Sequence, residues 1–197
     1  MILYCATSNA GKLREFRGAA GAAFEIEPLP DLARIPPPEE TGVTFEANAL
    51  LKARYYARFA HGTPLFAEDS GLEAEALDGA PGVYSARFAG PDATDSANND
   101  LLLARLATAA NRTARYVAVI ALVLPGREPI TFRGAVEGQI LTAPRGTGGF
   151  GYDPLFFYPP FDATFAEVSA ERKLTVSHRG RTVEKMKEFL SSACIRG

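Results

Sequence analysis

The stretch "RYVAVIALVL", residues Arg115 to Leu124, decides the fold class of this chain. Every position after its arginine is apolar, so no alternation separates a buried face from an exposed one. A strand of this kind is typical of the centre of a sheet that is covered on both faces. The "PGRE" turn that follows leads into "PITFRGAVEGQIL", residues 129–141, which is predicted to be the neighbouring strand. These two strands form the predicted centre of an α/β fold.

The N-terminal segment has the order of a strand, a loop and a helix. The apolar run "ILYCA" predicts a buried strand over residues 2–6. It is followed by the polar turn "TSNAGK" and by "LREFRGAAGAAF", in which Leu13, Phe16 and Ala20 share one helical face. This order is typical of an α/β unit. Further along the chain we predict strands at 24–29 and 64–71, helices at 44–60 and 95–109, a last helix from Ser177, and a glycine-rich loop around a strand at 78–90.

The composition is that of an ordinary globular protein. Of the 197 residues, 47% are hydrophobic and 22% are charged, and no repeat or linker is visible, so we expect a single domain in two lobes over residues 1–197. The formal net charge is -2 and no basic stripe appears, which argues against a nucleic-acid-binding protein but leaves room for a small phosphorylated ligand. The N-terminal apolar run is too short for a signal peptide or a membrane span, so we expect a cytoplasmic protein with no membrane partner.

The cysteines and histidines are too few for a metal or disulfide framework. The two cysteines are Cys5 and Cys194, and the two histidines are His61 and His178. Neither pair has the number or spacing of a disulfide scaffold or a zinc site. The sequence therefore argues against a disulfide framework, a zinc site and a His-rich metal site.

The loop "GTGGFGYDP", residues 146–154, matches the glycine spacing of a dinucleotide-binding loop. That motif functions only when a helix follows it, because the helix N-terminus faces the pyrophosphate. Here Pro154, Pro159 and Pro160 follow the loop and oppose a helix. The glycines therefore predict another kind of loop, and no hydride cofactor is expected.

The turn "TSNAGK", from Thr7 to Lys12, is suited to bind phosphate. It joins the first predicted strand to a helix, so its backbone N–H groups and the helix dipole favour an anion, and Lys12 adds a positive charge. It is not a Walker A loop, which has a longer glycine-spaced run before its lysine. A solvated turn with no ligand is the alternative interpretation.

Two acid pairs are candidates for a metal site. Glu68 and Asp69 lie in "AEDSG", where a strand is predicted to end, and they are expected to face opposite sides of it. Glu39 and Glu40 lie in "PEETG", just before a helix, where they also suit the helix N-terminus. Carboxylates from two such loops are what Mg²⁺ accepts, with waters and phosphate oxygens filling the other positions.

The stretch "KLTVSHRG" brings Lys173, His178 and Arg179 into a short segment. Ser177 is suited to cap the last helix, which leaves His178 and Arg179 in its first turn, where positive charge opposes the helix dipole. That cost indicates a ligand, although a solvated basic helix start is the alternative. Asn48 and Lys52 lie four residues apart on one face of the second helix, and we expect that face to be exposed to solvent, with a position toward the same site as the alternative.

Taken together and in order, these segments resemble the inosine/xanthosine triphosphate pyrophosphatase family of housecleaning nucleotide hydrolases. The resemblance extends from about Thr7 to beyond Gly180. It implies an elongated mixed sheet flanked by helices, with the active site in the cleft between two lobes, and a homodimer. It also implies a Mg²⁺-dependent hydrolysis of non-standard purine nucleoside triphosphates, namely ITP, dITP and XTP, to the monophosphate and pyrophosphate. The segments that carry the resemblance are "TSNAGKLREF", "EETGVTFEANALLKA", "AEDSGLEAEALDGAPGVYSARFAG", "GTGGFGYDPLF" and "KLTVSHRG".

The resemblance also implies roles for individual residues. Asp69 would be the essential carboxylate, acting as the base and in the metal site, although a metal-activated water is an alternative to Asp69 as the source of the nucleophile. Glu39 would be the second metal ligand, with Glu40 as the alternative. The substrate would contact Thr7, Ser8, Asn9, Ala10, Gly11, Lys12, Ser70, Phe150, Gly151, Tyr152, Asp153, Lys173, His178 and Arg179.

Two other functions are alternatives at this stage. A Maf-type nucleotide pyrophosphatase would share the architecture but prefer other bases. A nucleotide-binding sensor without catalysis is opposed by the presence of both Glu39 and Asp69.

Overall fold

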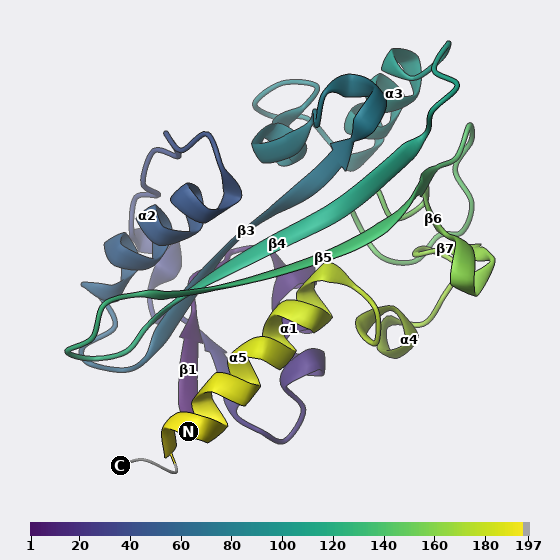
Figure 1. The fold of residues 1–197 in the computed structure, drawn as a ribbon. Coiled ribbons are helices and arrows are strands. Elements are labelled where there is room, and N and C mark those ends of the chain that lie inside the picture. Colours follow the sequence, from purple (N-terminus) through teal and green to yellow (C-terminus); the bar gives the residue numbers. More distant parts are fainter. Residues whose placement is uncertain (195–197) are drawn as a thin grey trace.

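The computed structural model describes residues 1–194, which form a seven-stranded sheet with helices on both faces (Figure 1). The strand order is β2-β1-β3-β4-β5-β6-β7. β1 runs parallel to β2 and β3, and the other neighbours are antiparallel, so the sheet is mixed, as expected. The strands are β1 (Ile2–Cys5), β2 (Glu25–Pro28), β3 (Leu65–Ala74), β4 (Thr113–Val123), β5 (Ile130–Ile140), β6 (Phe156–Tyr158) and β7 (Ala163–Thr164).

Helices cover the sheet at positions close to those predicted. Thr44 caps the second helix by accepting a hydrogen bond from Ala47 N–H, and Ser177 accepts one from Gly180 N–H at the start of the last. No helix among residues 1–194 is long and apolar enough to cross a membrane. The α-helices are α1 (Ala10–Ala20), α2 (Phe45–Ala57), α3 (Asp95–Arg105), α4 (Ala170–Leu174) and α5 (His178–Cys194), and the 3₁₀ helices are η1 (Leu32–Arg34), η2 (Glu75–Leu77), η3 (Gly82–Arg87) and η4 (Pro159–Phe161).

The central strand β4 is buried on both faces, which confirms the prediction from "RYVAVIALVL". Ile120 and Leu122 pack in the core with α1 and α5, whereas Val117 and Val119 pack with α2 on the opposite face. Figure 1 accordingly shows α2 on one side of the long strands and α1 and α5 on the other. The alternation of β4 side chains therefore separates two helical layers.

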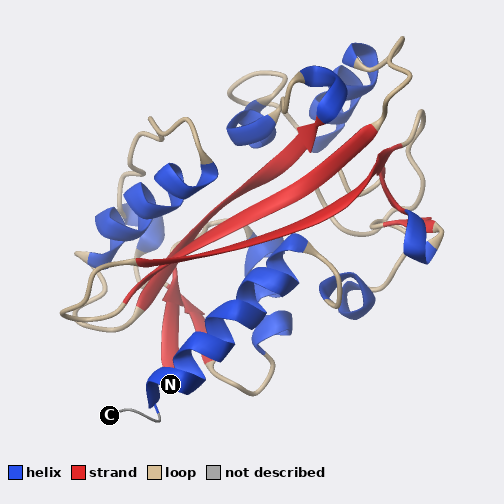
Figure 2. Cartoon of the chain, viewed as in Figure 1, coloured by secondary structure: helices blue, strands red, loops and turns tan. Residues whose placement is uncertain are grey.

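The long strands β3, β4 and β5 extend from these helices to a second lobe at the other end of the sheet (Figure 2). There Leu72, Leu102, Tyr116 and Phe156 belong to a separate core cluster that joins β3, α3, β4 and β6. Glu68, Asp69 and Ser70 of β3 lie between these two parts of the sheet, since Phe66 belongs to the first core and Leu72 to the second.

Two segments differ from the sequence-based prediction. The predicted short strand at 64–71 continues to Ala74, because β4 pairs with it over its full length, so Glu68 and Asp69 lie within the strand and not at its end. The segment 78–90 contains η3 in place of a strand, because the Ser85 hydroxyl donates to Gly82 C=O and accepts from Leu72 N–H, which closes a helical turn on β3.

The first turn of α5 rests directly on β5 at Gly134. A Cβ atom at Gly134 would lie 2.2 Å from the carbonyl oxygen of His178 and 2.4 Å from the hydroxyl of Thr182. Only glycine permits this close approach of helix and strand. Gly134 therefore fixes the position of the α5 N-terminus, which carries two of the predicted site residues.

Candidate active site

The predicted phosphate loop emerges beside an unpaired edge of β3. β1 pairs with β3 only as far as Phe66, so the loop that follows β1 lies next to the residues after Phe66. Asn9 caps α1 by accepting a hydrogen bond from Lys12 N–H at 3.0 Å. The Lys12 ammonium lies 2.8 Å from Oε2 of Glu68 on β3. The predicted order of strand, loop and helix is confirmed, and it directs Lys12 toward the sheet.

Arg179 is the centre of a buried charge network on the α1 and α5 face of the sheet. Its guanidinium lies 3.0 Å from Glu68 Oε1 and 2.8 Å from Glu15 Oε2, and it donates to the Ser70 hydroxyl at 2.8 Å. Arg179 is 4% exposed and Glu68 is 7% exposed. The predicted conflict between Arg179 and the α5 dipole is therefore offset by two carboxylates.

Lys173 extends this network toward the glycine-rich loop. Its ammonium lies 2.6 Å from Glu15 Oε1 and also contacts Oδ2 of Asp153. Asp153 in turn accepts hydrogen bonds from Phe150 N–H and from the Tyr116 hydroxyl. Lys173 thus joins α1 and the loop within one buried set of charges.

The network shifts the pKa values of its members. Burial alone would raise the pKa of Glu68, but the charges of Lys12 and Arg179 outweigh it and lower the pKa to about 2. At Glu15 burial would likewise raise the pKa, but the charges of Arg179 and Lys173 outweigh it. The pKa of Glu15 therefore lies below its ordinary value of 4.5. At Asp153 burial dominates and raises the pKa, although Lys173 acts against it. Glu68 and Glu15 therefore stay ionised and hold their cationic partners in place.

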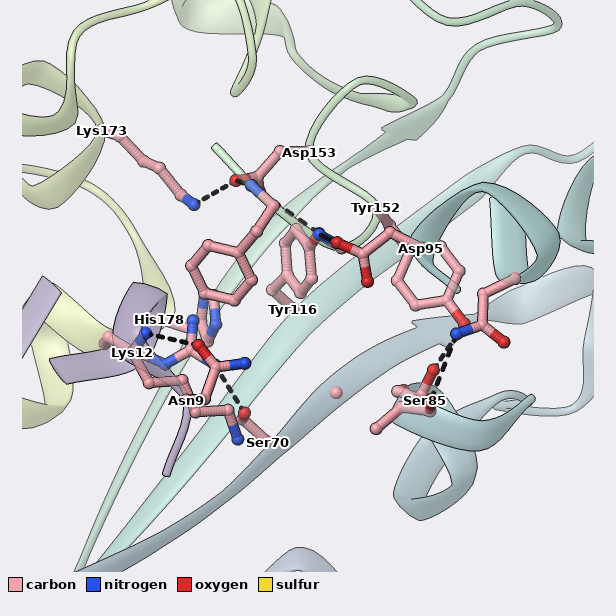
Figure 3. Close-up of a pocket in the computed structure, with 16 residues that line it drawn as sticks. Asn9, Lys12, Ser70, Ser85, Asp95, Tyr116, Tyr152, Asp153, Lys173 and His178 are labelled. Carbon is pink, nitrogen blue, oxygen red and sulfur yellow. Dashed lines mark hydrogen bonds and ion pairs between the residues drawn. The ribbon is translucent and has the colours of Figure 1, made fainter. Parts of the chain in front are cut away.

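A cavity opens beside this network, between the glycine-rich loop and the sheet (Figure 3). Phe150 lies on its wall, with its ring centroid 5.1 Å from the Lys173 ammonium and 5.2 Å from the Arg179 guanidinium carbon. A Cβ atom on Gly11 would lie 2.8 Å from the Phe150 ring, so the ring rests against the first turn of α1. The cavity therefore has an aromatic face placed beside two cations.

The side chain of His178 lies buried in the same cavity wall and stacks on Tyr116, with the ring centroids 4.6 Å apart and an interplanar angle of 11°. Burial, followed by the charges of Arg179 and Lys173, lowers the pKa of His178 well below its ordinary value, so the imidazole is neutral. Its Nδ1 atom has no hydrogen-bond partner within residues 1–194. A buried polar atom without a partner is rare in folded proteins, so His178 is an unusual member of this wall.

A second charge cluster lies on the opposite face of β3. Lys52 of α2 contacts Oδ1 of Asp69 and Oε1 of Glu40, each at 2.8 Å, and Asn48 donates to Oδ2 of Asp69 at 3.3 Å. Our expectation that Asn48 and Lys52 face solvent is wrong: Asn48 is 0% exposed and the Lys52 side chain is 13% exposed. They turn inward because the Asp69 carboxylate gives their polar groups a buried partner. Glu39 is exposed and lies outside this cluster.

Burial raises the pKa of Asp69 above its ordinary value, with Lys52 acting in the opposite direction and Glu40 and Glu68 adding to the rise. The pKa of Glu40 is lowered, because the charge of Lys52 outweighs the effect of burial, and Arg87 and Lys12 contribute. The influence of Lys12 on Glu40, and of Glu68 on Asp69, shows that the clusters on the two faces of β3 are electrostatically coupled.

The donor set of the second cluster fits one kind of metal. No group of three or more His, Cys, Asp or Glu side chains in residues 1–194 is arranged to hold a metal ion. Glu40 and Asp69 supply two carboxylates that share one cation, Lys52. Mg²⁺ is commonly held by one or two carboxylates together with substrate phosphates. The cluster therefore suits Mg²⁺ that arrives with a phosphorylated ligand, and not a metal held by protein ligands alone.

The glycine-rich loop is irregular, as its prolines predict. Gly146, Gly149 and Gly151 all have positive φ angles, which side-chain-bearing residues rarely adopt. The loop brings Phe150, Gly151, Tyr152 and Asp153 to the cavity, and the cavity wall also includes Asn9, Lys12, Ser70, Lys173, His178 and Arg179. Thr7, Ser8 and Ala10 line a neighbouring hollow beside Leu29, and Gly11 meets the cavity only through Phe150.

Sequence reasoning missed Glu15 and Tyr116. Glu15 lies three residues after Lys12, so helical spacing places both on one face of α1, and this was an available signal. Tyr116 belongs to the apolar run of β4 and carried no signal of its role beside His178.

Comparison with known proteins decides the family. A model of the Ham1 family matches residues 3–189. The chain belongs to the Ham1 family. A Ham1-type relative from an Exiguobacterium species, named dITP/XTP pyrophosphatase, is 50% identical over 187 residues, which are 94% of this chain and 95% of that protein. The protein of the same name from Thermus thermophilus is 48% identical over 191 residues, or 95% of this chain and 91% of that protein.

Solved Ham1 structures share the fold. The Ham1 protein of Staphylococcus aureus has a TM-score of 0.87 at 38% identity, with 98% of this chain and 100% of that chain covered. A Ham1 protein from Coxiella burnetii has a TM-score of 0.86 at 38% identity, with 98% and 99% covered. The expected elongated mixed sheet with flanking helices is confirmed.

Proposed function

We propose that this Ham1-family chain hydrolyses the non-standard purine nucleoside triphosphates ITP, dITP and XTP to the monophosphate and pyrophosphate, and so removes them from the nucleotide pool. The names of its relatives support the reaction class, since proteins about 50% identical over nearly their whole length are dITP/XTP pyrophosphatases. The single observation that carries the proposal is the cavity in which Lys173 and Arg179 lie beside the ring of Phe150, with His178 in the same wall.

This cavity suits an oxidised purine. Hypoxanthine and xanthine present a 6-oxo acceptor and an N1–H donor, whereas adenine presents a 6-amino donor and a bare N1 acceptor. Lys173 and Arg179 can only donate hydrogen bonds, so they can pair with a 6-oxo acceptor but not with the 6-amino donor of adenine. A site that depends on such pairing discriminates by about 10⁴ or more. Phe150 offers a flat apolar face against which a purine stacks.

The triphosphate would extend from this cavity along the loop after β1. Lys12 supplies positive charge on one face of β3, and Lys52 supplies it on the other. Glu40 and Asp69 would hold Mg²⁺, in preference to the exposed Glu39. Bound there, the metal would neutralise charge on phosphate oxygens during transfer. Phosphoryl transfer depends mainly on such positioning and charge neutralisation.

In the proposed reaction a water oxygen bonds to the α-phosphorus and the bond from the α-phosphorus to the α,β-bridging oxygen breaks. Pyrophosphate leaves, and the proton from water passes to the Asp69 carboxylate. Asn48 and Lys52 orient that carboxylate through its two oxygens. Such a fixed base is the usual arrangement for general base catalysis.

The proposal includes a single two-lobed domain that acts as a cytoplasmic homodimer. A surface hollow at α2 and η3 supports the dimer, because Val43 is 86% exposed and Tyr84 is 58% exposed beside it. Cys5 is a buried free thiol, as is common in proteins of reducing compartments.

The test is a pyrophosphate-release assay with ITP, dITP, XTP, GTP and ATP at saturating Mg²⁺. We expect kcat/KM for ITP to exceed that for ATP by about 10⁴. Comparable values for ATP and ITP would defeat the proposed selectivity. Faster hydrolysis of dTTP or UTP would favour a Maf-type pyrophosphatase, and tight ITP binding with no pyrophosphate release would favour a nucleotide sensor.

A further inference from the structure

Helix α3 holds the glycine-rich loop through hydrogen bonds to both the N–H and the C=O group of Gly151. Oδ2 of Asp95 accepts a hydrogen bond from Gly151 N–H at 2.6 Å, and Nδ2 of Asn99 donates to Gly151 C=O at 3.1 Å. Asp95 and Asn99 are four residues apart on the helix, so they present neighbouring side chains to the loop. We refer to these two hydrogen bonds as the α3 clasp.

The helix that carries the clasp is itself fixed to the core. Asn98 is buried, accepts a hydrogen bond from Ala89 N–H and donates to Ala86 C=O. Leu102 is fully buried in the core of the second lobe. Thr94 caps the helix through a bond from Ala97 N–H. The clasp therefore connects the loop to a helix that is itself held by buried side chains.

The clasp acts at the residue that follows Phe150. Gly151 has a φ angle of +64°, and Phe150 N–H donates to Asp153. The peptide between the Phe150 ring and the clasp has few ways to move while these bonds persist. Asp95 lies on the cavity wall (Figure 3), so the clasp reaches to the edge of the space that a purine would fill.

We propose that Asp95 and Asn99 are positioning residues that hold the Phe150 ring in place for purine binding. The inference rests on the proposed function, because it assumes that the cavity accepts the base. A ring already fixed in its bound position loses less conformational freedom when a base stacks on it. Removal of the clasp lets the ring move, and purine binding weakens while the reacting phosphates keep their partners on β3 and α1.

Kinetics with ITP test this idea in the Asp95→Ala and Asn99→Ala variants. We expect KM to rise about five- to tenfold, the effect of one or two lost hydrogen bonds, with kcat changed less than about twofold. Asp95→Asn keeps an acceptor oxygen and should restore KM to near wild type. Asp95→Asn removes the same negative charge from the α3 N-terminus as Asp95→Ala does. A difference in KM between the two variants therefore reports the lost hydrogen bond to Gly151 and not a change at the helix dipole.

Two further measurements separate positioning from general damage. Asp100→Ala is the matched control, since Asp100 is an exposed carboxylate of the same helix whose side chain makes no hydrogen bond within residues 1–194, and its KM should not change. Tripolyphosphate lacks a base, so its inhibition constant should be the same for wild type and Asn99→Ala. An equal loss of ITP and tripolyphosphate binding, or an equal fall in kcat, would overturn the positioning role.

Amide hydrogen exchange over residues 145–155 measures the clasp without any substrate. We expect faster exchange of this segment in Asp95→Ala and Asn99→Ala than in wild type or Asp100→Ala, with β4 unchanged as an internal reference. Unchanged exchange would show that the clasp does not order the loop. If the wild type does not hydrolyse ITP at all, the proposed function fails, while exchange still decides whether the clasp orders the loop. Faster exchange with an unaltered KM would refute the inferred effect on purine binding.

Discussion

The Lys52 ammonium lies 2.8 Å from Oδ1 of Asp69, across the space between α2 and the sheet. The same ammonium lies 2.8 Å from Oε1 of Glu40. Burial by itself would lower the pKa of Lys52, but the two carboxylates outweigh it and the pKa is raised, so the lysine keeps its charge. Asp69 is thereby oriented from two sides, by Lys52 and by Asn48.

Replacement of Asp69 by asparagine should remove turnover and leave the fold intact. Asparagine has the same shape but cannot accept the proton from water, so kcat should fall by about 10²–10⁴. The measurement is pyrophosphate release from ITP at saturating Mg²⁺, with circular dichroism to verify folding. Wild-type turnover in a folded Asp69→Asn protein would exclude Asp69 from the chemistry.

Glu40 and Glu39 are adjacent in sequence, and their variants should behave differently. Glu40→Gln removes one of the two carboxylates that contact Lys52, so the Mg²⁺ concentration for half-maximal turnover should rise about tenfold or more. Glu39→Gln alters an exposed side chain outside the cluster and should leave that concentration unchanged. A Mg²⁺ titration of both variants decides between them, and the reverse result would assign the metal to Glu39.

Gly11→Ala should impair substrate binding without loss of stability. The new methyl group would lie 2.8 Å from the Phe150 ring and displace it, so KM for ITP should rise several-fold, as expected for about 1 kcal/mol of lost interaction. Gly11 is the second residue of α1, so the helix-propensity gain of alanine, at most about 1 kcal/mol, acts against the crowding, and the melting temperature should stay close to that of wild type. An unaltered KM would mean that the ring position does not affect binding.

Glu15→Gln should destabilise the protein in a pH-dependent way. Near pH 7 the variant leaves Lys173 and Arg179 short of one carboxylate, and we expect a loss of about 3 kcal/mol in the free energy of unfolding. The folded-state pKa of Glu15 is below its ordinary value of 4.5, so its contribution is complete above pH 4.5 and is lost as the pH falls through the lowered pKa. The difference from wild type should therefore narrow in acid.

Urea unfolding at pH 7, 4 and 3 measures that difference for Glu15→Gln, because the contribution is lost only below pH 4.5. The exposed carboxylate of Glu25, at the start of β2, supplies the control variant Glu25→Gln, which should match wild type at each pH. A constant difference between wild type and Glu15→Gln across this range would contradict the assigned pKa shift.

The regular elements could be predicted because their signals are local. The apolar run of β4 predicts a central strand, and Thr44 and Ser177 predict where α2 and α5 begin. The 78–90 segment could not be predicted in the same way. Its 3₁₀ helix depends on the hydrogen bond between Ser85 and Leu72, which are thirteen residues apart in the chain.

Site residues could be predicted where charged side chains cluster within a short segment. The prediction failed where the burial of a side chain depends on a partner far along the chain. Lys173, Arg179 and Asp153 were expected near a ligand, and they line one cavity. Helical spacing placed Lys52 and Asn48 on a polar face, which suggests exposure. Their burial depends on Asp69, seventeen or more residues later, and the periodicity of one helix contains no information about such a partner.

The pairing of β3 with β4 determines where the chain tolerates insertions and deletions. Glu68 is paired with Ile120 and Asp69 with Val119, so each acid points to its own side of the sheet. Loss or gain of a single codon between positions 65 and 67 would turn each acid to the wrong side. Glu68 would then face Lys52, and Asp69 would face Arg179. Insertions and deletions in natural descendants of this gene should therefore accumulate in surface turns and be absent from this short tract.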